Sequence, residues 1–433
     1  MVQRFDARDA DFEQRFQALL DAKREVSSDV NAVVAEIIDD VRARGDEAVA
    51  ELTAGFDRWD ATPENLELTQ DDVDRAEADC DADTLTALKL AAERIEAHHR
   101  RQMPQDDRYV DHAGVELGHR WTAVDAVGLY VPGGTAAYPS SVLMNALPAR
   151  VAGVERIVMV VPTQDEVMNP LVLAAAGLAG VDEIYRIGGA QAVAALAHGT
   201  ARIAPVSKIV GPGNAYVAAA KRQVFGTVGI DMIAGPSEVL VLADKDNDPA
   251  WLAADLLAQA EHDASAQSIL ITDDRDLADA VEREVQRQLQ SLPRAEMAGR
   301  SWSDFGAVIT LGAIADAPPL VDRVAPEHLE IATRNPDTLL DAIRNAGAVF
   351  LGAHTPEAIG DYVAGSNHVL PTARSARFSS GLGVLDFMKR TSILRCGAQG
   401  LAAIGPAAMA LGRAEGLEAH ARSVAIRLEP SSE

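Results

Sequence analysis

The chain has 433 residues, more than one hydrophobic core usually supports, so we expect two or more domains. Its 39 basic and 65 acidic residues give a net charge of −26, which argues against nucleic acid and anionic membranes as partners. No run reaches the roughly 18 apolar residues of a membrane span. Two distant cysteines, Cys80 and Cys396, and an N-terminus without an apolar segment predict a cytoplasmic protein.

The acidic residues are scattered through expected helices rather than gathered in one tail, as in DRAEADCDADT and DDRDLADAVERE. One interpretation is an ordinary acidic cytosolic protein. We favour adaptation to a very salty cytoplasm, where salt screens the self-repulsion within a few ångströms and carboxylates keep the surface hydrated. Low salt should then destabilise the fold.

Residues 1 to about 105 read as helical. In DVNAVVAEIIDDVRARG the valines and isoleucines recur every three or four residues, which makes one apolar stripe. A second helix is expected in DTLTALKLAAERIEAHHRRQ, before Pro104. The chain ends in an Ala- and Gly-rich segment with a final helix around RAEGLEAHARSVAIR.

From about residue 120, short Val- and Ile-rich runs alternate with Ala-rich helical segments. Apolar strands without strict alternation, separated by helices, predict parallel sheets covered on both faces. The fold class is therefore α/β, with two Rossmann-like parallel-sheet domains plus small N- and C-terminal helical segments. The acidic turn ADKDNDPA and the loop before Ser237 are the expected passages between the two domains.

Three glycine turns between a strand and a helix indicate nucleotide binding. They are YVPGG at 130–134, IGGAQ at 187–191 and GPGN at 211–214. Helix N-termini offer free N–H groups to a phosphate, and glycine lets the phosphate approach the backbone. None has the GxGxxG spacing, so any one alone is more simply interpreted as an ordinary α/β turn. Three such turns at the same end of one sheet favour nucleotide binding and ordinary turns equally.

Gln259 and His262 in QAEHD lie three residues apart on an expected helix, so their side chains point the same way. Amide oxygen and imidazole suit zinc or a similar ion, but this pair supplies two of four ligands. Asp361 in GDYVAGSNHVLP and His420 in EGLEAH are candidates for the others. The alternative is a polar helix face without a metal.

Glu327 and His328 in APEHLEI place a carboxylate beside an imidazole, just ahead of an apolar strand. Histidine accepts and returns a proton near neutral pH, and glutamate can activate water. The pair therefore predicts acid–base chemistry. A polar turn before a strand remains the simpler interpretation from spacing alone.

Taken in order, eight segments resemble the histidinol dehydrogenase family over nearly the whole chain, less so in the first 100 residues. They are GLYVPGG, GGAQAVAALA, GPGNAYVAAAKRQV, DMIAGPSEVLVLAD, QAEHD, APEHLEI, GDYVAGSNHVLPT and EGLEAH. The resemblance implies oxidation of L-histidinol to L-histidine through histidinaldehyde with two NAD, the last step of histidine biosynthesis. It also implies one zinc ion per subunit.

The resemblance assigns roles to the matching positions. It implies Glu327 and His328 as the acid–base pair, and Tyr130, Gln191 and Asn214 as NAD contacts. Zinc ligands would be Gln259, His262, Asp361 and His420. Substrate contacts would be Ser237, Gln259, His262, His328, Asp361, His368, Glu415 and His420.

The resemblance further implies an intertwined homodimer with shared active sites, in which Glu415 and His420 come from the partner subunit. The expected division is an N-terminal helical segment (1–24), a first α/β domain (25–129 with 237–381), a second α/β domain (130–236) and a C-terminal dimerisation segment (382–433). The first domain would hold much of the zinc and acid–base site, and the second would bind NAD.

Two other functions remain open at this point. A related zinc- and NAD-dependent dehydrogenase of another small primary alcohol, such as a sulfonated diol, would share the same scaffold. A non-catalytic zinc- or nucleotide-binding protein would bind ligands without turnover.

Overall fold

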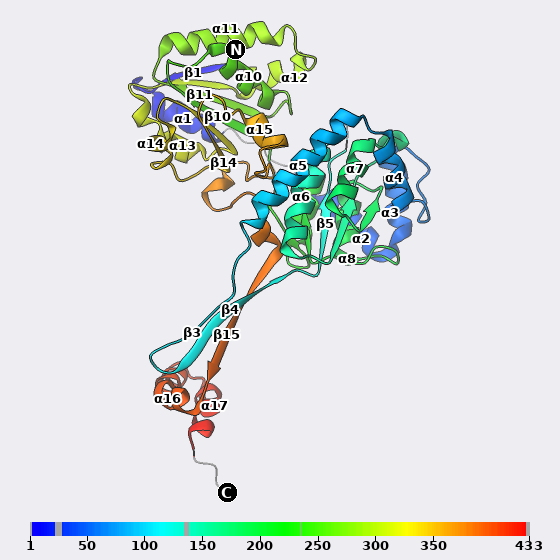
Figure 1. The fold of residues 1–433 in the computed structure, drawn as a ribbon, viewed down its shortest axis with the longest axis vertical. Helices are drawn as coiled ribbons and strands as arrows, with labels where there is room; N and C mark the ends of the chain where they lie inside the picture. The colour runs from blue at the N-terminus through cyan, green and yellow to red at the C-terminus, as the bar shows by residue number, and fades with distance from the viewer. Residues whose placement is uncertain (1, 22–27, 134–137, 234, 430–433) are drawn as a thin grey trace.

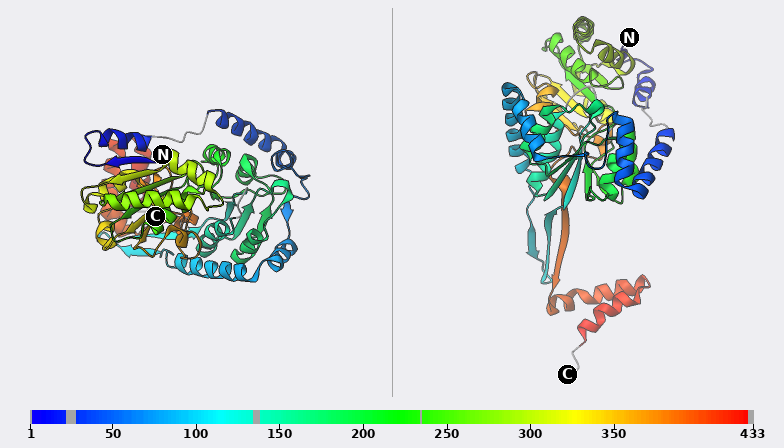
Figure 2. Two further views of the ribbon diagram at one scale, coloured as in Figure 1. Left: turned by 90° about the horizontal axis from the view of Figure 1, so that it is seen from above. Right: turned by 90° about the vertical axis from the view of Figure 1, so that its right-hand side faces the viewer.

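Two α/β domains and a long arm make up the molecule (Figure 1). A computed structural model describes residues 2–21, 28–133, 138–233 and 235–429. Figure 2 shows from the side how the arm carries the C-terminal helices away from both domains. Within the described residues, no helix is long and apolar enough to cross a bilayer.

Domain II, residues 28–100 and 126–230, surrounds a six-stranded sheet of order β2-β7-β6-β5-β8-β9. All neighbours are parallel except the edge pair β2 and β7. Its strands are β2 (Glu67–Leu68), β5 (Ala126–Tyr130), β6 (Arg156–Val160), β7 (Glu183–Tyr185), β8 (Lys208–Val210) and β9 (Gly229–Ile230). Its helices are α2 (Ser28–Arg44), α3 (Asp46–Asp57), α4 (Gln70–Asp79), α5 (Ala82–Arg100), α6 (Pro139–Ala152), η1 (Gln164–Glu166), α7 (Pro170–Ala179), α8 (Gly189–His198) and α9 (Ala215–Val224).

Both faces of the domain II sheet are buried, as the sequence predicts. On β5, Val127 and Leu129 point into one apolar cluster with α4 to α7, whereas Ala126 and Tyr130 point into another with α2, α3, α8 and α9. Successive side chains on a strand face opposite ways, so a strand buried on both faces reads as one continuous apolar run.

Domain I, residues 3–21 and 238–362, holds a fully parallel sheet of order β1-β12-β11-β10-β13-β14. Its strands are β1 (Gln3–Asp6), β10 (Glu238–Ala243), β11 (Gln267–Thr272), β12 (Ala307–Thr310), β13 (His328–Ala332) and β14 (Ala348–Leu351). Its helices are α1 (Phe12–Asp21), α10 (Pro249–Ala260), α11 (Arg275–Leu289), α12 (Ala295–Phe305), η2 (Ile314–Asp316), α13 (Pro318–Val324), α14 (Pro336–Leu340) and α15 (Glu357–Tyr362). Two apolar clusters again cover its two faces.

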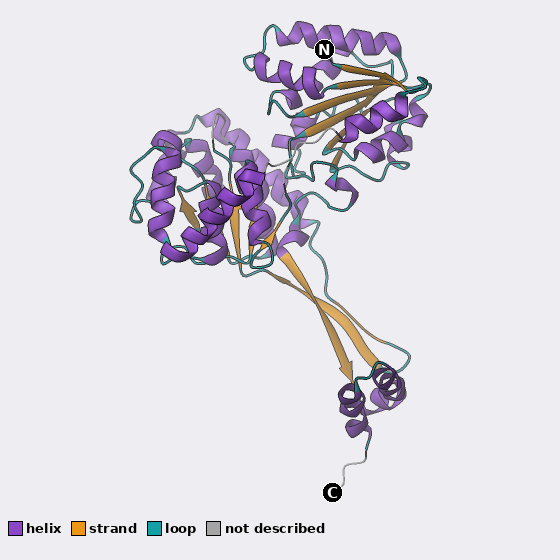
Figure 3. Ribbon diagram, turned by 180° about the vertical axis from the view of Figure 1, so that it is seen from behind, coloured by secondary structure: helices purple, strands orange, loops and turns teal. Residues whose placement is uncertain are grey.

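The arm is a three-stranded antiparallel sheet of order β15-β4-β3 that ends in a helical hairpin (Figure 3). It consists of β3 (Asp107–Val110), β4 (Val115–Ala123), β15 (Met388–Cys396), α16 (Ala398–Ala414) and α17 (Glu418–Leu428). Residues 363–387, with η3 (Ser375–Arg377) and η4 (Val384–Phe387), lead from domain I to the arm. Val369, Val384 and Phe387 of this segment pack into a domain II cluster, which ties the three parts together.

Part of the expected domain division is wrong. Helices α2 to α5 belong to domain II, since β2 pairs with β7 and these helices pack on the clusters of that sheet. The N-terminal segment contains a strand as well as a helix, and β1 pairs with β12 of domain I. The passage between domains follows β9, ahead of Ser237, whereas the acidic turn ADKDNDPA lies within domain I between β10 and α10. An apolar stripe predicts a helix but does not say which sheet it covers.

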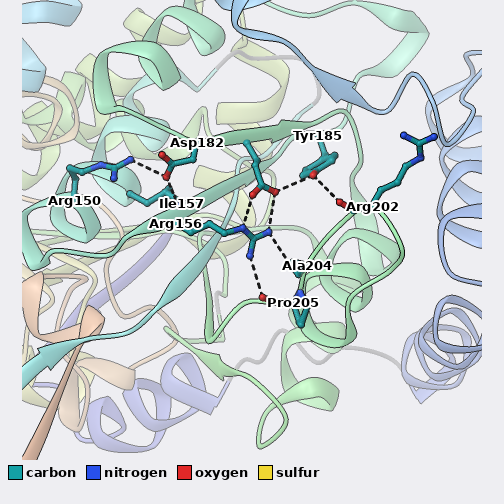
Figure 4. A network of polar contacts seen from close by, with 9 residues as sticks. Arg150, Arg156, Ile157, Asp182, Tyr185, Arg202, Ala204 and Pro205 are labelled. Atoms are coloured by element: carbon teal, nitrogen blue, oxygen red, sulfur yellow. Dashed lines mark hydrogen bonds and ion pairs between the residues drawn. The ribbon is translucent and has the colours of Figure 1, made fainter.

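Polar contacts tie the amino ends of β6 and β7 to the loop before β8 (Figure 4). Arg156 pairs with Glu183 at 2.6 Å and donates to the carbonyls of Ala204 and Pro205 at 3.0 and 3.2 Å. The Tyr185 hydroxyl donates to Glu183 at 3.0 Å. This network lies at the edge opposite the glycine turns, so it supports the sheet without entering a site.

Candidate active site

At the carboxyl edge of the domain II sheet, the glycine turns line one cavity of about 430 Å³. β5 ends at Tyr130, α8 begins after Gly188, and α9 begins after Asn214. Tyr130, Gln191 and Asn214, the predicted NAD contacts, all line this cavity. Two helix N-termini meet here, which is the arrangement that favours an anionic group such as a phosphate.

The polar groups of this cavity are held in place by local bonds. The Tyr130 hydroxyl accepts the N–H of Gly189 at 3.0 Å, and burial raises the pKa of Tyr130 to about 12. Asn214 caps α9, its side-chain oxygen accepting the N–H groups of Tyr216 and Val217 at 3.0 and 3.2 Å. Gln191 is 1% exposed, and its side-chain oxygen has no hydrogen-bond partner among the described residues. A ligand with a donor group would satisfy that oxygen.

A buried ion pair fixes the turn at Gly211. Lys221 and Asp231 are in contact, with side chains 2% and 1% exposed. The Lys221 ammonium donates to the Gly211 carbonyl at 2.9 Å, and Asp231 accepts the Gly211 N–H at 2.8 Å. Gly211 has φ +107°, and a Cβ there would collide with the Tyr130 carbonyl. The turn therefore requires glycine and is clamped on both sides.

Sequence reasoning missed one carboxylate of this cavity. Asp57, the last residue of α3, is buried and lines the wall. Burial raises the pKa of Asp57, while a hydrogen bond from the Thr163 N–H at 3.2 Å opposes the rise. No motif marks this residue, because the helix that carries it was expected to belong to the other domain.

The second site lies at the amino edge of the domain I sheet. His328 is the first residue of β13, and Glu238 is the first residue of β10. α10 runs back to this edge and ends at Ala260, which brings Gln259 and His262 there. α15 adds Asp361 and a residue that the sequence did not single out, Glu357.

His328 is held so that one ring nitrogen faces the site. Its Nδ1 lies 3.1 Å from the backbone carbonyl oxygen of Glu238, so Nδ1 carries the hydrogen and Nε2 the lone pair. Nε2 is buried, has no hydrogen-bond partner among the described residues, and lies 3.7 Å from Asp361 Oδ1. Glu327 lies beside the ring, 3.7 Å from Nδ1, and its carboxylate accepts the Glu238 N–H at 2.9 Å.

Burial keeps the histidines of this site neutral and opposes ionisation of its carboxyl groups. It is the main cause that lowers the pKa of His328 to about 3 and that of His368 to about 4, and the neighbouring His262 contributes to both shifts. It raises the pKa of Asp361 to about 6. Burial raises the pKa of Glu357 well above its usual value, with Asp361 and Glu330 adding to the rise. Among the described residues, His328 is the only basic side chain that lies within 4 Å of the Asp361 or the Glu357 carboxyl group.

The donor set fits a bound cation. Ligand atoms of His328, Glu357 and Asp361 all lie within 4.8 Å of one another. The Gln259 amide lies against Glu357: turned one way, its nitrogen donates to the two carboxylate oxygens at 2.6 and 3.2 Å. Turned the other way, its oxygen faces those oxygens, which is favourable when Glu357 is protonated or when a cation lies between them. Nitrogen and oxygen ligands of these types suit zinc.

The remaining substrate candidates of this edge lie close by. The His368 ring is held between the Asp361 carbonyl at 3.0 Å and the Ser141 hydroxyl of α6 at 3.2 Å. This contact joins domain II to the site, and sequence reasoning missed Ser141. Ser237 directly precedes β10, and its carbonyl accepts the Gln267 N–H at 3.0 Å. His262 reaches solvent, yet surrounding protein lowers its pKa by desolvation.

Glu415 and His420 are not brought to this site within one chain. Glu415 directly follows α16, and His420 lies on α17, the two helices at the far end of the arm (Figure 1). Both are exposed. Their assignment to a partner's site therefore stays a prediction.

Together, the fold and the two sites define a two-domain α/β protein, with a buried cluster of histidines and carboxyl groups in one domain and a cavity at two helix N-termini in the other. The family model named histidinol dehydrogenase matches residues 20–428. The histidinol dehydrogenase of Rhizobium meliloti (strain 1021) is 69% identical over 433 residues, 100% of both chains. That of Agrobacterium fabrum is 68% identical over 423 residues, 98% of both.

A solved structure agrees with these matches. The crystal structure of histidinol dehydrogenase from Elizabethkingia anophelis is similar with a TM-score of 0.94 and 35% identity, covering 99% of this chain and 98% of that one. The chain belongs to the histidinol dehydrogenase family, as its motifs indicate.

Proposed function

We propose that the chain oxidises L-histidinol to L-histidine through histidinaldehyde, using zinc and two NAD in succession, as the last step of histidine biosynthesis. The observation that carries this is the buried cluster around His328. Its Nε2, without a hydrogen-bond partner among the described residues, lies 3.7 Å from Asp361 Oδ1, and the carboxyl groups of Asp361 and Glu357 lie close enough together to share a cation. The family membership supports the substrate.

His328 is the base of both oxidations. The Glu238 carbonyl fixes its tautomer, so Nε2 accepts the proton of the alcohol as hydride leaves the same carbon. The product of this step is the aldehyde. A neutral imidazole is required for the step, and burial maintains that state.

Glu327 serves the second half of the reaction. Its carboxylate is oriented by the Glu238 N–H and directs a water molecule to the aldehyde carbon. As the water adds, Glu327 takes one of its protons and His328 returns the proton it holds to the aldehyde oxygen, which forms the hydrate. The hydrate then loses a second hydride, and His328, neutral again, takes its hydroxyl proton, which leaves the carboxylic acid. Buried walls keep the reactive aldehyde from leaving between the steps.

Gln259, His262 and Asp361 would hold zinc together with His420 of the partner subunit. The ion, when bound, anchors and orients the imidazole and amine of the substrate. Ser237 and His368 contact the substrate, together with Glu415 of the partner subunit. The fixed ring of His368, between Ser141 and the Asp361 carbonyl, suits an orienting role.

Tyr130, Gln191 and Asn214 bind NAD, which accepts the hydride. The unpartnered oxygen of Gln191 supplies an acceptor inside the cavity, and the α8 N-terminus favours the pyrophosphate.

A homodimer completes the site. The arm carries Glu415 and His420 far from the domain I cluster of their own chain. It also exposes apolar side chains, Leu394, Leu411, Leu417 and Ile426, which a second copy would cover.

The test is to incubate the purified protein with L-histidinol, NAD and zinc, following NADH and histidine together. We expect two NADH per histidine, abolished by a chelator and restored by zinc. Absence of NADH from a folded, zinc-loaded dimer would reject histidinol as substrate and direct the search to other small primary alcohols. Ligand binding without turnover of any alcohol would identify a non-catalytic binding protein.

A further inference from the structure

A carboxylate lines the wall of the domain II cavity. This is unexpected, because a negative charge repels the anions that the cavity would bind. Asp57 is 5% exposed and lines the cavity together with Tyr130, and its charge adds to the rise that burial causes in the pKa of the Tyr130 hydroxyl. The Thr163 N–H engages Asp57 Oδ2 at 3.2 Å and fixes the side chain. A buried charge held this way needs a partner in the bound state.

The cavity holds two groups that act oppositely on a phosphate. The N-terminus of α8 attracts the pyrophosphate, whereas Asp57 repels any phosphate near it. Asp57 must therefore face a neutral group that donates hydrogen bonds. No arginine or lysine is among the described residues that line the cavity, and residues 134–137, whose placement is not described, are GTAA in sequence.

Apolar side chains beside Asp57 indicate which end of the dinucleotide lies there. Val33 and Ile37 of α2 and Phe56, the neighbour of Asp57, line the same cavity. A wall of this kind suits the flat adenine base rather than a phosphate. The group between an adenine on this wall and a pyrophosphate at α8 is the adenosine ribose.

We propose that Asp57 is the specificity-determining residue for the dinucleotide: its carboxylate accepts a hydrogen bond from the adenosine ribose and rejects a 2′-phosphate. The enzyme thereby selects NAD over NADP. This inference rests on the proposed function, because it assigns the domain II cavity to NAD.

The basic residue next to Asp57 is committed elsewhere. Arg58 forms two bonds to Asp165, at 2.8 and 2.6 Å, on the surface. It is thus engaged in an ion pair instead of supplying the cation that a 2′-phosphate needs. Removing the Asp57 charge should therefore weaken discrimination without creating a strong NADP site.

The experiment measures binding by calorimetry with four probes, 5′-AMP, adenosine 2′,5′-bisphosphate, NADH and NADPH, on the zinc-loaded protein. Asp57→Asn keeps an oxygen to accept the Thr163 N–H, and Asp57→Ser is a second uncharged variant. Loss of a charge-assisted hydrogen bond should weaken 5′-AMP and NADH about tenfold. Relief of like-charge repulsion should strengthen the bisphosphate and NADPH, so the NADH to NADPH affinity ratio falls about 100-fold.

Asp60→Asn is the matched control, because it removes the same charge from an exposed position outside the cavity. It should keep the parent's ratio. If both Asp57 variants also keep that ratio, Asp57 does not determine specificity, and the cofactor site itself stands. If the parent binds neither NADH nor 5′-AMP, the assignment of NAD to this cavity fails, and the role of Asp57 with it.

Discussion

The two α/β domains share an architecture but place their sites at opposite edges of their sheets. Domain II uses the carboxyl ends of β5, β7 and β8, where α8 and α9 begin. Domain I uses the amino ends of β10 and β13, where α10 ends beside Gln259. Helix N-termini are positive and C-termini negative, so the first edge suits an anion and the second a cation. The helix end that faces a site, rather than the type of sheet, sets the charge of its ligand.

The two sites also differ in what they are made of. The domain II cavity is formed by glycine turns, backbone N–H groups and uncharged side chains around one carboxylate. The domain I site is formed by buried histidines and carboxyl groups with shifted pKa values. Substitutions in domain II should therefore act through shape and binding, and those in domain I through chemistry.

The largest effect is expected at His328. Because we propose Nε2 of His328 as the proton acceptor, His328→Ala should lower kcat about 1000-fold, while zinc content and NADH affinity stay normal. Turnover is measured under saturating substrates, and zinc by elemental analysis. His354→Ala, which removes an exposed imidazole of the same domain, should keep the parent's kcat. If His328→Ala were as active as the parent, His328 would not be the base, and the contrast between a chemical site in domain I and a binding site in domain II would fail.

The buried pair of domain II should give the next effect, on stability. Lys221→Met leaves Asp231 charged and unpaired in the interior, which should lower the free energy of unfolding by about 3–5 kcal/mol. Urea unfolding followed by tryptophan fluorescence measures it. Arg58→Met breaks an exposed ion pair of the same domain and should cost about 1 kcal/mol or less. Equal losses in the two variants would show that the clamp at Gly211 is not a structural requirement.

A smaller effect, on NADH affinity, is expected from a change in the shape of the domain II cavity alone. Gly211→Ala should weaken NADH binding about 30-fold, since a Cβ there meets the Tyr130 carbonyl and moves the turn. Gly226→Ala is the matched control: its φ of +102° imposes similar backbone strain, but no atom lies within 4 Å of the added Cβ. Calorimetric titration separates the two. Equal affinity losses would assign the effect to backbone strain instead of cavity shape.

Much of the domain II site could be predicted from sequence, because its signals are local. A glycine turn between a strand and a helix implies a helix N-terminus, and parallel strands place such turns at one edge. Tyr130, Gln191 and Asn214 meet in the cavity as expected. Asp57 was missed because α3 packs on this sheet through contacts distant in sequence, which periodicity does not encode.

The domain I site was predicted only in part, for a related reason. The pair Gln259 and His262 is local to α10, and Glu327 and His328 are local to the start of β13. Glu357 was missed although it lies four residues before Asp361 on one short helix, a spacing that places both on one face. That spacing was the available signal. The arm was read as helical at its end only, since β3, β4 and β15 are largely polar strands without an apolar run.

The smallest expected effect is that of salt on the stability of the fold. It concerns the acidic residues outside both sites, such as those of α4 and α11. Screening alone reduces repulsion to a range of about 10 Å at 0.1 M salt and about 3 Å at 1 M, so in an ordinary acidic protein the stabilisation levels off below roughly 1 M KCl. Adaptation to a salty cytoplasm predicts a further gain between about 1 and 3 M, on the order of 1 kcal/mol. Thermal unfolding across a KCl series measures it, with the Rhizobium meliloti relative, 69% identical, as the matched control. A plateau shared by both proteins would leave the charge of −26 as ordinary surface acidity. A gain confined to this chain would show that surface charge, unlike either site, has diverged between them.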